Sequence, residues 1–267
     1  DHYTYVFSGD GCLMEGISHE VCSLAGTLGL NKLILIYDMN SISIDGDTSI
    51  AFTENIKKRF DSYGWNVIDN IDGHDFKSIE HSISRAKRER SKPTIICMKT
   101  TIGFGSPNKQ GTSGIHGAPL GSAEVELTRK NLGWKFDPFH IPKYIYNEWS
   151  AIKTGNVLEL EWNKKLKSYK ASYPKLYIEL QRRLKNKLPS ELNKRLDKLI
   201  ENSDKSMATR KSSQVVLEHI GPVLPELIGG SADLKESNLV FWPESKPFSK
   251  KDPTGKYIHY GVREFGM

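Results

Sequence analysis

Short apolar runs alternate with segments of helical periodicity over the first hundred residues. The runs at 3–8, 32–37, 65–68 and 94–98 are rich in β-branched, aromatic and aliphatic side chains, the composition typical of strands. The run 32–37 (KLILIY) is apolar almost throughout, as expected for a strand buried on both faces. Because helical stripes separate these runs, the pattern predicts an α/β fold built on a parallel sheet.

The helical stripes have apolar residues every three or four positions. The apolar spacing at 14–28 predicts one helix, and Gly29 is expected to end it. Further helices are predicted at 56–63 and 76–86. Apolar positions on the first stripe are Ile17, Val21, Leu24 and Leu28, and those on the last are Phe76, Ile79, Ile83 and Ala86.

The pattern changes in the second half of the chain. Residues 149–203 are rich in Lys, Glu and Leu at loosely helical spacing, which predicts helices that lead into a linker. A second α/β pattern starts near residue 207. Its predicted elements are a helix at 213–220 and strands at 226–229 and 257–260.

Composition narrows the class of protein. The 267 residues are 37% hydrophobic and 26% charged, which is typical of a globular protein. No apolar run approaches the roughly 18 residues of a membrane span, so no membrane partner is expected. The start lacks a secretory signal, and three cysteines without paired spacing predict reduced thiols and a cytoplasmic location. Both ends fall inside patterned segments, which predicts an incomplete chain.

The net charge of +6 raises the question of nucleic acid. No motif that reads DNA or RNA accompanies the basic residues, and most of the positive excess lies at 164–194, on a predicted solvated helical face. We therefore expect no nucleic-acid partner. An anionic small substrate explains a basic balance equally well.

The strongest chemical signal is Gly9-Asp10-Gly11, then twenty-eight intervening residues, then Asn40. Each motif comes directly after a predicted strand, and parallel strands bring their carboxyl ends to one edge. Mg²⁺ prefers a near-octahedral set of oxygens. The Asp10 carboxylate, the Asn40 amide oxygen and the Ile42 backbone carbonyl supply three of them. Gly-Asp-Gly alone is a common turn, but the pair of motifs predicts a metal–diphosphate site, at which the 14–28 helix also aims its N-terminus.

Longer blocks of sequence extend this signal. The chain is similar to transketolases, and most similar to the bacterial branch, essentially from residue 1 to residue 267. The blocks that carry the resemblance are SGDGCLMEGISHEVCSLAG, YDMNSISIDG, KTTIGFGSPNKQGTSGIHGAPLG, ATRKSSQ, GGSADLKESN and HYGVREFGM, in this order.

The resemblance implies an enzyme that moves a two-carbon ketol unit from a ketose phosphate to an aldose phosphate in the pentose phosphate pathway. It implies thiamine diphosphate with Mg²⁺ (or Ca²⁺ or Mn²⁺), sugar phosphate substrates, and a homodimer with active sites between subunits. The implied parts are a diphosphate-binding domain at 1–172, a helical linker at 173–206, and the start of a pyrimidine-binding domain at 207–267.

Site residues follow from the matching blocks. Glu264 and His116 are the implied catalytic residues, with Glu264 on the aminopyrimidine ring of the partner subunit's cofactor. The implied cofactor-binding residues are Gly11, Glu15, Asn40, Ile102, His116 and Glu264. The implied metal ligands are Asp10, Asn40 and Ile42, and the implied substrate-binding residues are His116, Arg210 and Ser237.

Two alternatives stay open. Other thiamine-diphosphate enzymes, such as deoxyxylulose-phosphate synthase, phosphoketolase or dihydroxyacetone synthase, share the cofactor motif. A non-catalytic fragment that keeps the fold as an interaction subunit is the second. Taken singly, His116 is typical of a loop histidine, Arg210 of an exposed linker charge and Glu264 of a surface carboxylate.

Overall fold

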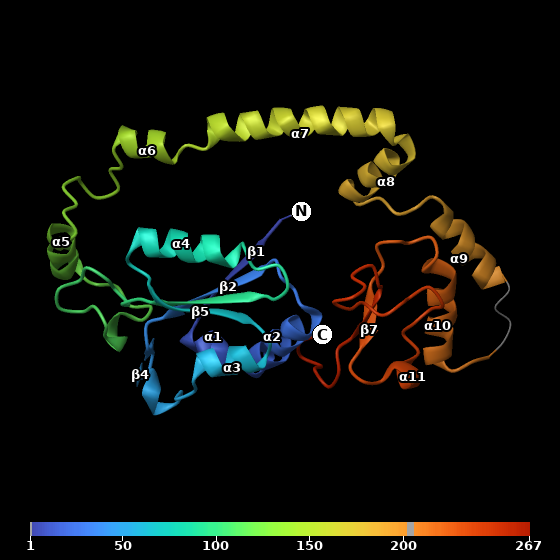
Figure 1. The fold of residues 1–267 in the computed structure, drawn as a ribbon, viewed down its shortest axis with the longest axis horizontal. Helices are drawn as coiled ribbons and strands as arrows, with labels where there is room; N and C mark the ends of the chain where they lie inside the picture. The colour runs from blue at the N-terminus through green and yellow to red at the C-terminus, as the bar shows by residue number, and fades with distance from the viewer. Residues whose placement is uncertain (1, 202–205) are drawn as a thin grey trace. The chain divides into compact units, whose positions relative to one another are not determined.

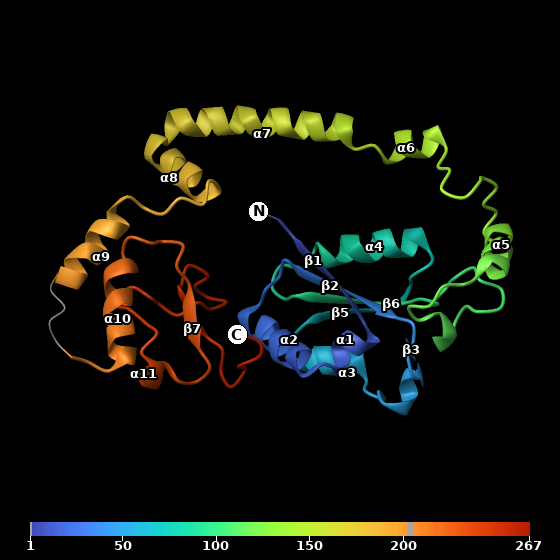
Figure 2. The ribbon, with the colours of Figure 1, turned by 180° about the vertical axis from the view of Figure 1, so that it is seen from behind.

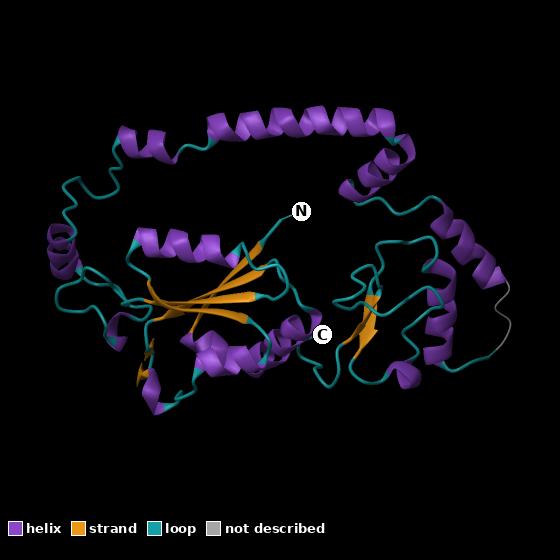
Figure 3. Cartoon of the chain, viewed as in Figure 1, coloured by secondary structure: helices purple, strands orange, loops and turns teal. Residues whose placement is uncertain are grey.

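The computed structural model describes residues 2–201 and 206–267. Its contacts divide the chain into two compact units. Unit 1 comprises Asp1–Trp134, Ile228–Asn238 and Ser245–Met267, and unit 2 comprises Lys135–Leu227 and Leu239–Glu244. The larger sheet belongs to unit 1, and the regular elements of unit 2 are helices; Figure 3 colours strands orange and helices purple. Residues 202–205 of the predicted linker lie outside the described residues, and the domain boundaries at 172 and 206 stay predictions.

Unit 1 is organised around a four-stranded parallel sheet. Its strands are β1 (Thr4–Gly9), β2 (Leu33–Met39), β5 (Asn66–Asp72) and β6 (Thr94–Lys99), in the order β1-β2-β6-β5. The sequence-based prediction of a parallel α/β sheet is therefore confirmed. The register pairs Gly9 with Asp38 and Asp38 with Met98, so the carboxyl ends of three strands lie at one edge.

Helices cover both faces of this sheet (Figures 1 and 2). One face packs against α1 (Asp10–Met14), α2 (Gly16–Leu28) and α3 (Ile56–Ser62), and the other against α4 (Phe76–Ala86). Alternate residues of the strands therefore enter two separate cores. The core under α1 to α3 contains Leu13, Cys22, Ala25, Leu35, Tyr37, Ile56, Phe60, Trp65, Ile95 and Cys97, and that under α4 contains Ile34, Ile36, Ile68, Ile71, Ala86, Ile96 and Met98.

The prediction of a single helix at 14–28 is wrong at its N-terminal end, where the structure has two helices. The chain forms α1 directly after β1, breaks at Glu15 with an extended backbone (φ −61°, ψ 136°), and then forms α2. Apolar spacing does not report this break, because one extended residue barely disturbs the stripe. The Arg59 guanidinium of α3 donates to the Leu13 carbonyl at 3.0 Å, which satisfies an acceptor at the end of α1. Gly29 ends α2 in the left-handed region (φ 64°), as predicted.

Shorter elements complete unit 1. Sequence patterning did not reveal the hairpin of β3 (Ile42–Ser43) and β4 (Gly46–Asp47), or α5 (Ser122–Asn131). The predicted strand 226–229 overlaps β7 only at Gly229, whereas the strand predicted at 257–260 is confirmed as β8. The remaining elements are η1 (Thr48–Ile50), η2 (Ser113–Ile115), β7 (Gly229–Ser231), α11 (Lys235–Asn238) and β8 (Tyr257–His259), with β7 and β8 parallel.

Unit 2 is helical, as predicted for this part of the chain. Its helices are α6 (Lys143–Trp149), α7 (Ile152–Ser172), α8 (Pro174–Leu184), α9 (Glu191–Glu201) and α10 (Thr209–Ile220). Within residues 2–201 and 206–267, none of the helices combines the length and apolar character that crossing a membrane requires.

Charged side chains tie α8 to the segment after α10. Arg182 donates to both oxygens of Glu179 (2.8 and 2.6 Å) and to both oxygens of Glu226 (2.9 and 2.8 Å), and Arg183 also donates to Glu179. We call these four residues the α8 ion-pair cluster. Hydrogen bonds from Arg182 and Arg183 lower the pKa of Glu179 to about 2.

Candidate metal and cofactor site

Asp10 is the first residue of α1 and lies at the carboxyl end of β1. Gly9, the last residue of the strand, precedes it, and the helix begins without a side-chain cap. The Asp10 side chain is 6% exposed, which is unusual for a carboxylate. The change from strand to helix at this residue turns its side chain toward the edge of the sheet, where β2 also ends.

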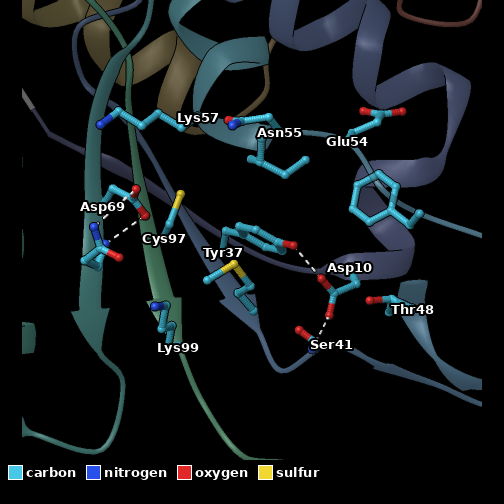
Figure 4. A pocket seen from close by; sticks show the side chains of 14 residues that line it. Asp10, Tyr37, Ser41, Thr48, Glu54, Asn55, Lys57, Asp69, Cys97 and Lys99 are labelled. Carbon is cyan, nitrogen blue, oxygen red and sulfur yellow. Dashed lines mark hydrogen bonds between the residues drawn. The ribbon is translucent and has the colours of Figure 1, made fainter.

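Two neutral donors hold the Asp10 carboxylate (Figure 4). The Tyr37 hydroxyl, from β2, donates to Oδ1, and the Ser41 backbone N–H donates to Oδ2 at 3.0 Å. Burial, followed by the hydrogen bond to Asp10, raises the pKa of Tyr37 above its ordinary value of 10. The hydroxyl therefore keeps its proton at neutral pH and acts as the donor.

The loop after β2 carries the other predicted metal ligands. Ser41 has a φ of 61°, a left-handed conformation that non-glycine residues adopt rarely, and this turn presents its N–H to Asp10. The Asn40 amide oxygen accepts from the Ile42 N–H at 3.0 Å. Asp10 is therefore hydrogen-bonded to Ser41, the residue between Asn40 and Ile42. Their joint binding of one metal ion stays a prediction.

A cavity of about 340 Å³ opens beside Asp10. Acidic and basic side chains both line it, and Figure 4 shows them arranged around Tyr37 and Cys97. Burial raises the pKa of the Cys97 thiol to about 12, so this sulfur is an unreactive part of the wall. The charged lining residues are Asp10, Glu54, Lys57, Asp69 and Lys99.

The Asp10 carboxylate fits a divalent cation. Within the described part of the chain, no lysine, arginine or histidine forms an ion pair with it. A buried carboxylate without a cationic partner is costly, and an ion bound at Oδ1 or Oδ2 offsets that cost. The described residues hold no group of three His, Cys, Asp or Glu side chains suited to a metal. The predicted set needs only one such residue, because an amide and a carbonyl oxygen complete it.

The predicted cofactor residues in α1 and its break are exposed. Gly11 lies within α1, and a Cβ built on it meets no atom within 4 Å. A methyl side chain at position 11 would therefore clash with no atom of the described chain. Glycine would be needed there only if a bound group came close to the backbone. Glu15 is exposed at the break between α1 and α2.

Two further predicted residues lie in the long loop after β6. The Ile102 carbonyl accepts from the Gly111 N–H at 2.8 Å, and the His116 N–H donates to the Ser113 carbonyl at 3.0 Å. His116 is exposed and follows η2. Neither Ile102 nor His116 lines the cavity beside Asp10.

The remaining predicted residues belong to other parts of the chain. Glu264 is exposed in a segment that contacts α2, where the Gly266 N–H donates to Glu20 at 2.7 Å. It does not line the cavity beside Asp10. Arg210 is exposed near the start of α10 in unit 2, whereas Ser237 is exposed in α11 of unit 1. Their predicted action as a pair stays a prediction.

Sequence reasoning missed two residues that hold the Asp10 region. Tyr37 lies in an aliphatic run, where a hydroxyl needs a hydrogen-bond partner once buried. That requirement was the available signal for its contact with Asp10. Arg59 is 10% exposed at its side chain and contacts Glu54, His19 and Leu13. Nothing in the local pattern of α3 distinguished it from an exposed arginine.

Comparisons with known families agree with this geometry. Residues 1–189 match the family model described as transketolase, thiamine diphosphate binding domain. Residues 205–267 match the model described as transketolase, pyrimidine binding domain. The first of these ranges contains the sheet and Asp10, and the second contains β7 and β8. The fold and the two family matches therefore define the class of protein. It is a thiamine diphosphate binding domain followed by sequence of a pyrimidine-binding domain.

Individual relatives are similar along the whole chain. The chain is 55% identical over 270 aligned positions to a transketolase of Buchnera aphidicola (subsp. Acyrthosiphon pisum), and 54% identical to transketolase 2 of Escherichia coli K12. Each match covers 100% of this chain and 40% of the relative. The chain belongs to the transketolase family.

Solved structures give the same result. A Pichia stipitis transketolase in complex with sedoheptulose 7-phosphate superposes with a TM-score of 0.91 at 43% identity, and a Campylobacter jejuni transketolase with a TM-score of 0.85 at 38% identity. Both matches cover 100% of this chain and 40% of the other chain. The chain therefore spans 40% of the length of the transketolases that it matches.

Proposed function

We propose that this chain forms the metal–diphosphate half of a transketolase active site. In the proposed reaction, the protein that carries it transfers a two-carbon ketol unit from a ketose phosphate to an aldose phosphate. Thiamine diphosphate, when bound, supplies the carbon nucleophile for this transfer. The residues of this chain bind the cofactor and orient the substrates.

One observation carries the proposal. The buried Asp10 carboxylate is held by two neutral donors and has no cationic partner among the described residues. This arrangement supports a divalent ion, preferably Mg²⁺, with Asn40 and the Ile42 carbonyl as further ligands. The ion would offset the charge of the diphosphate, and family membership identifies the diphosphate with that of thiamine.

Other predicted residues take roles outside the metal site. His116 is proposed to donate to substrate oxygens, since imidazole donors suit developing alkoxide charge. Arg210 and Ser237 are proposed to hold the terminal phosphate of the sugar, for which a guanidinium is well shaped. Glu264 is proposed to hydrogen-bond the aminopyrimidine ring across a homodimer interface. Its absence from the Asp10 cavity agrees with a contribution from a second subunit.

Cofactor binding tests the proposal directly. Titrating the chain with thiamine diphosphate by isothermal calorimetry should give binding that requires Mg²⁺ and is abolished by EDTA. Asn40→Ala should weaken this binding, whereas His140→Ala, which alters an exposed histidine outside the proposed site, should not. Equal binding with and without Mg²⁺ would reject the metal–diphosphate site.

A non-catalytic role is the second candidate. It is favoured by the places of two predicted residues within unit 1, because His116 and Glu264 do not line the cavity beside Asp10. Under either candidate the isolated chain should show little ketol transfer from xylulose 5-phosphate to ribose 5-phosphate. Restored turnover after adding the remaining segments of a related transketolase would favour the catalytic role, and unchanged inactivity the other.

A further inference from the structure

We propose that Tyr37 is a positioning residue that presents the Asp10 carboxylate to the divalent cation. The inference rests on the proposed function, because it concerns the ion which that function requires. It gives a role to a residue of β2 that the motif YDMNSISIDG contains but to which neither the motifs nor the family description assigns one. Its basis is the hydrogen bond from the Tyr37 hydroxyl to Asp10 Oδ1.

The packing of the Tyr37 ring fixes its hydroxyl. Tyr37 is 1% exposed and belongs to the core under α1 to α3, whose other members include Leu13, Phe60 and Cys97. Strand pairing sets it opposite Ser8 of β1 and Cys97 of β6. A ring held by a sheet and a packed core has little freedom, so the position of its hydroxyl is set by the fold rather than by the ligand.

Each oxygen of the Asp10 carboxylate accepts one hydrogen bond. Tyr37 donates to Oδ1 and the Ser41 N–H to Oδ2, which fixes the plane of the carboxylate as well as its position. An ionised carboxylate has about four lone-pair sites. Two neutral donors use two of them, so each oxygen keeps one for a metal ion.

The neutrality of both donors matters for the charge of the site. A lysine or arginine in the place of Tyr37 would compete with the cation for the carboxylate. A hydroxyl and a backbone amide orient the group and leave its negative charge for the ion. Hydrogen-bond partners of this kind around metal ligands typically change metal affinity by roughly 10–100-fold when removed.

The test compares two phenylalanine substitutions. Tyr37→Phe keeps the ring and removes only the hydroxyl that contacts Asp10. Tyr63→Phe is the matched control, because the Tyr63 hydroxyl pairs with His19 Nδ1 at 2.9 Å and packs beside the same core, yet does not contact the carboxylate. The measurement is the Mg²⁺ concentration at half-maximal thiamine diphosphate binding, by calorimetry, together with the urea midpoint of each variant.

We expect Tyr37→Phe to raise the half-saturating Mg²⁺ concentration about 10-fold and to reach the same maximal cofactor binding at high Mg²⁺. Tyr63→Phe should change it less than twofold. A purely structural role for the hydroxyl would lower the amount of bound cofactor at every Mg²⁺ concentration. That result, an unchanged Mg²⁺ requirement, or a Tyr37→Phe chain that does not fold would each overturn the proposal.

Failure of the proposed function gives a different result. In that case the unmodified chain would bind no thiamine diphosphate at any Mg²⁺ concentration, or Asp10→Asn would leave the Mg²⁺ requirement unchanged. If Asp10→Asn abolishes Mg²⁺-dependent cofactor binding while Tyr37→Phe has no effect, the metal site stands and only the role of Tyr37 is rejected.

Discussion

The Asp10→Asn variant should be at least as stable as the unmodified chain without metal, and less stable than it when Mg²⁺ and cofactor are bound. Asparagine has almost the same shape as aspartate, so the core around Tyr37 is kept. Its Oδ1 can accept from the Ser41 N–H, and its Nδ2 can donate to the Tyr37 hydroxyl, which then turns to accept. Both hydrogen bonds at this position therefore survive, and only the charge is lost.

The energy difference follows from that charge. A hydrogen bond to a charged group contributes roughly 1.5–3 kcal/mol and a neutral one about 1, so the two bonds together lose roughly 1–4 kcal/mol. Against this, burying an unpaired charge costs several kcal/mol, and Asp10 is only 6% exposed. We therefore expect metal-free Asp10→Asn to be at least as stable as the unmodified chain, by up to about 2 kcal/mol.

Ligand binding should invert this order. At a ligand concentration 100 times its dissociation constant, binding stabilises the folded state by about 2.7 kcal/mol. Only the unmodified chain should gain this amount from Mg²⁺ with thiamine diphosphate. Urea unfolding followed by tryptophan fluorescence, in EDTA and then with Mg²⁺ and cofactor, measures both terms. If Asp10→Asn is less stable by more than about 1 kcal/mol in EDTA, the carboxylate serves the fold and the reasoning is wrong.

Three further predictions concern thiols, glycines and acid stability. Cys12 is exposed whereas burial raises the pKa of Cys97 to about 12, so a disulfide reagent at pH 8 should modify Cys12 quickly and Cys97 only after unfolding in urea. Gly26→Ala should lower the unfolding free energy by roughly 1–3 kcal/mol, because its Cβ would lie 1.8 Å from a backbone oxygen. Gly155→Ala, which meets nothing within 4 Å, should raise it by up to about 1 kcal/mol in the same urea titration. The α8 ion-pair cluster lowers the pKa of Glu179 from 4.5 to about 2, so its stabilisation is complete above pH 4.5 and lost as pH falls toward 2. Glu179→Gln should therefore flatten the loss of melting temperature between pH 5 and pH 2, and an unchanged slope would count against the cluster.

The sheet could be predicted because each strand is a continuous apolar run with clear limits. The run 32–37 became β2, and its burial on both faces agrees with its composition. The break at Glu15 could not be predicted, because one extended residue leaves the apolar spacing almost unchanged, and the Arg59 side chain that contacts the end of α1 lies more than forty residues away. Short elements such as β3 and β4 depend on two residues each, which is too few for a periodic signal.

The candidate site divides in the same way. Asp10 and Asn40 could be located because both follow strands, and strand ends meet at one edge by the geometry of a parallel sheet. Tyr37 was hidden, because a tyrosine in a buried strand is also an ordinary core residue. His116 and Glu264 were named from resemblance, and their exposed positions carry no hydrophobic pattern from which to locate them.

The difference in burial between these two groups has a physical consequence. A buried carboxylate without a cation lowers the stability of the empty fold, yet Asp10 is fixed by a core tyrosine and a strained turn at Ser41. Features that cost stability and are held in place by rigid strands are typical of sites prepared for a ligand before it arrives. Exposed His116 and Glu264 have no such support within the described residues, so they gain fixed positions only from further contacts. The metal half of the site should therefore bind its ion in this chain alone, whereas orientation of the substrate requires a more complete assembly.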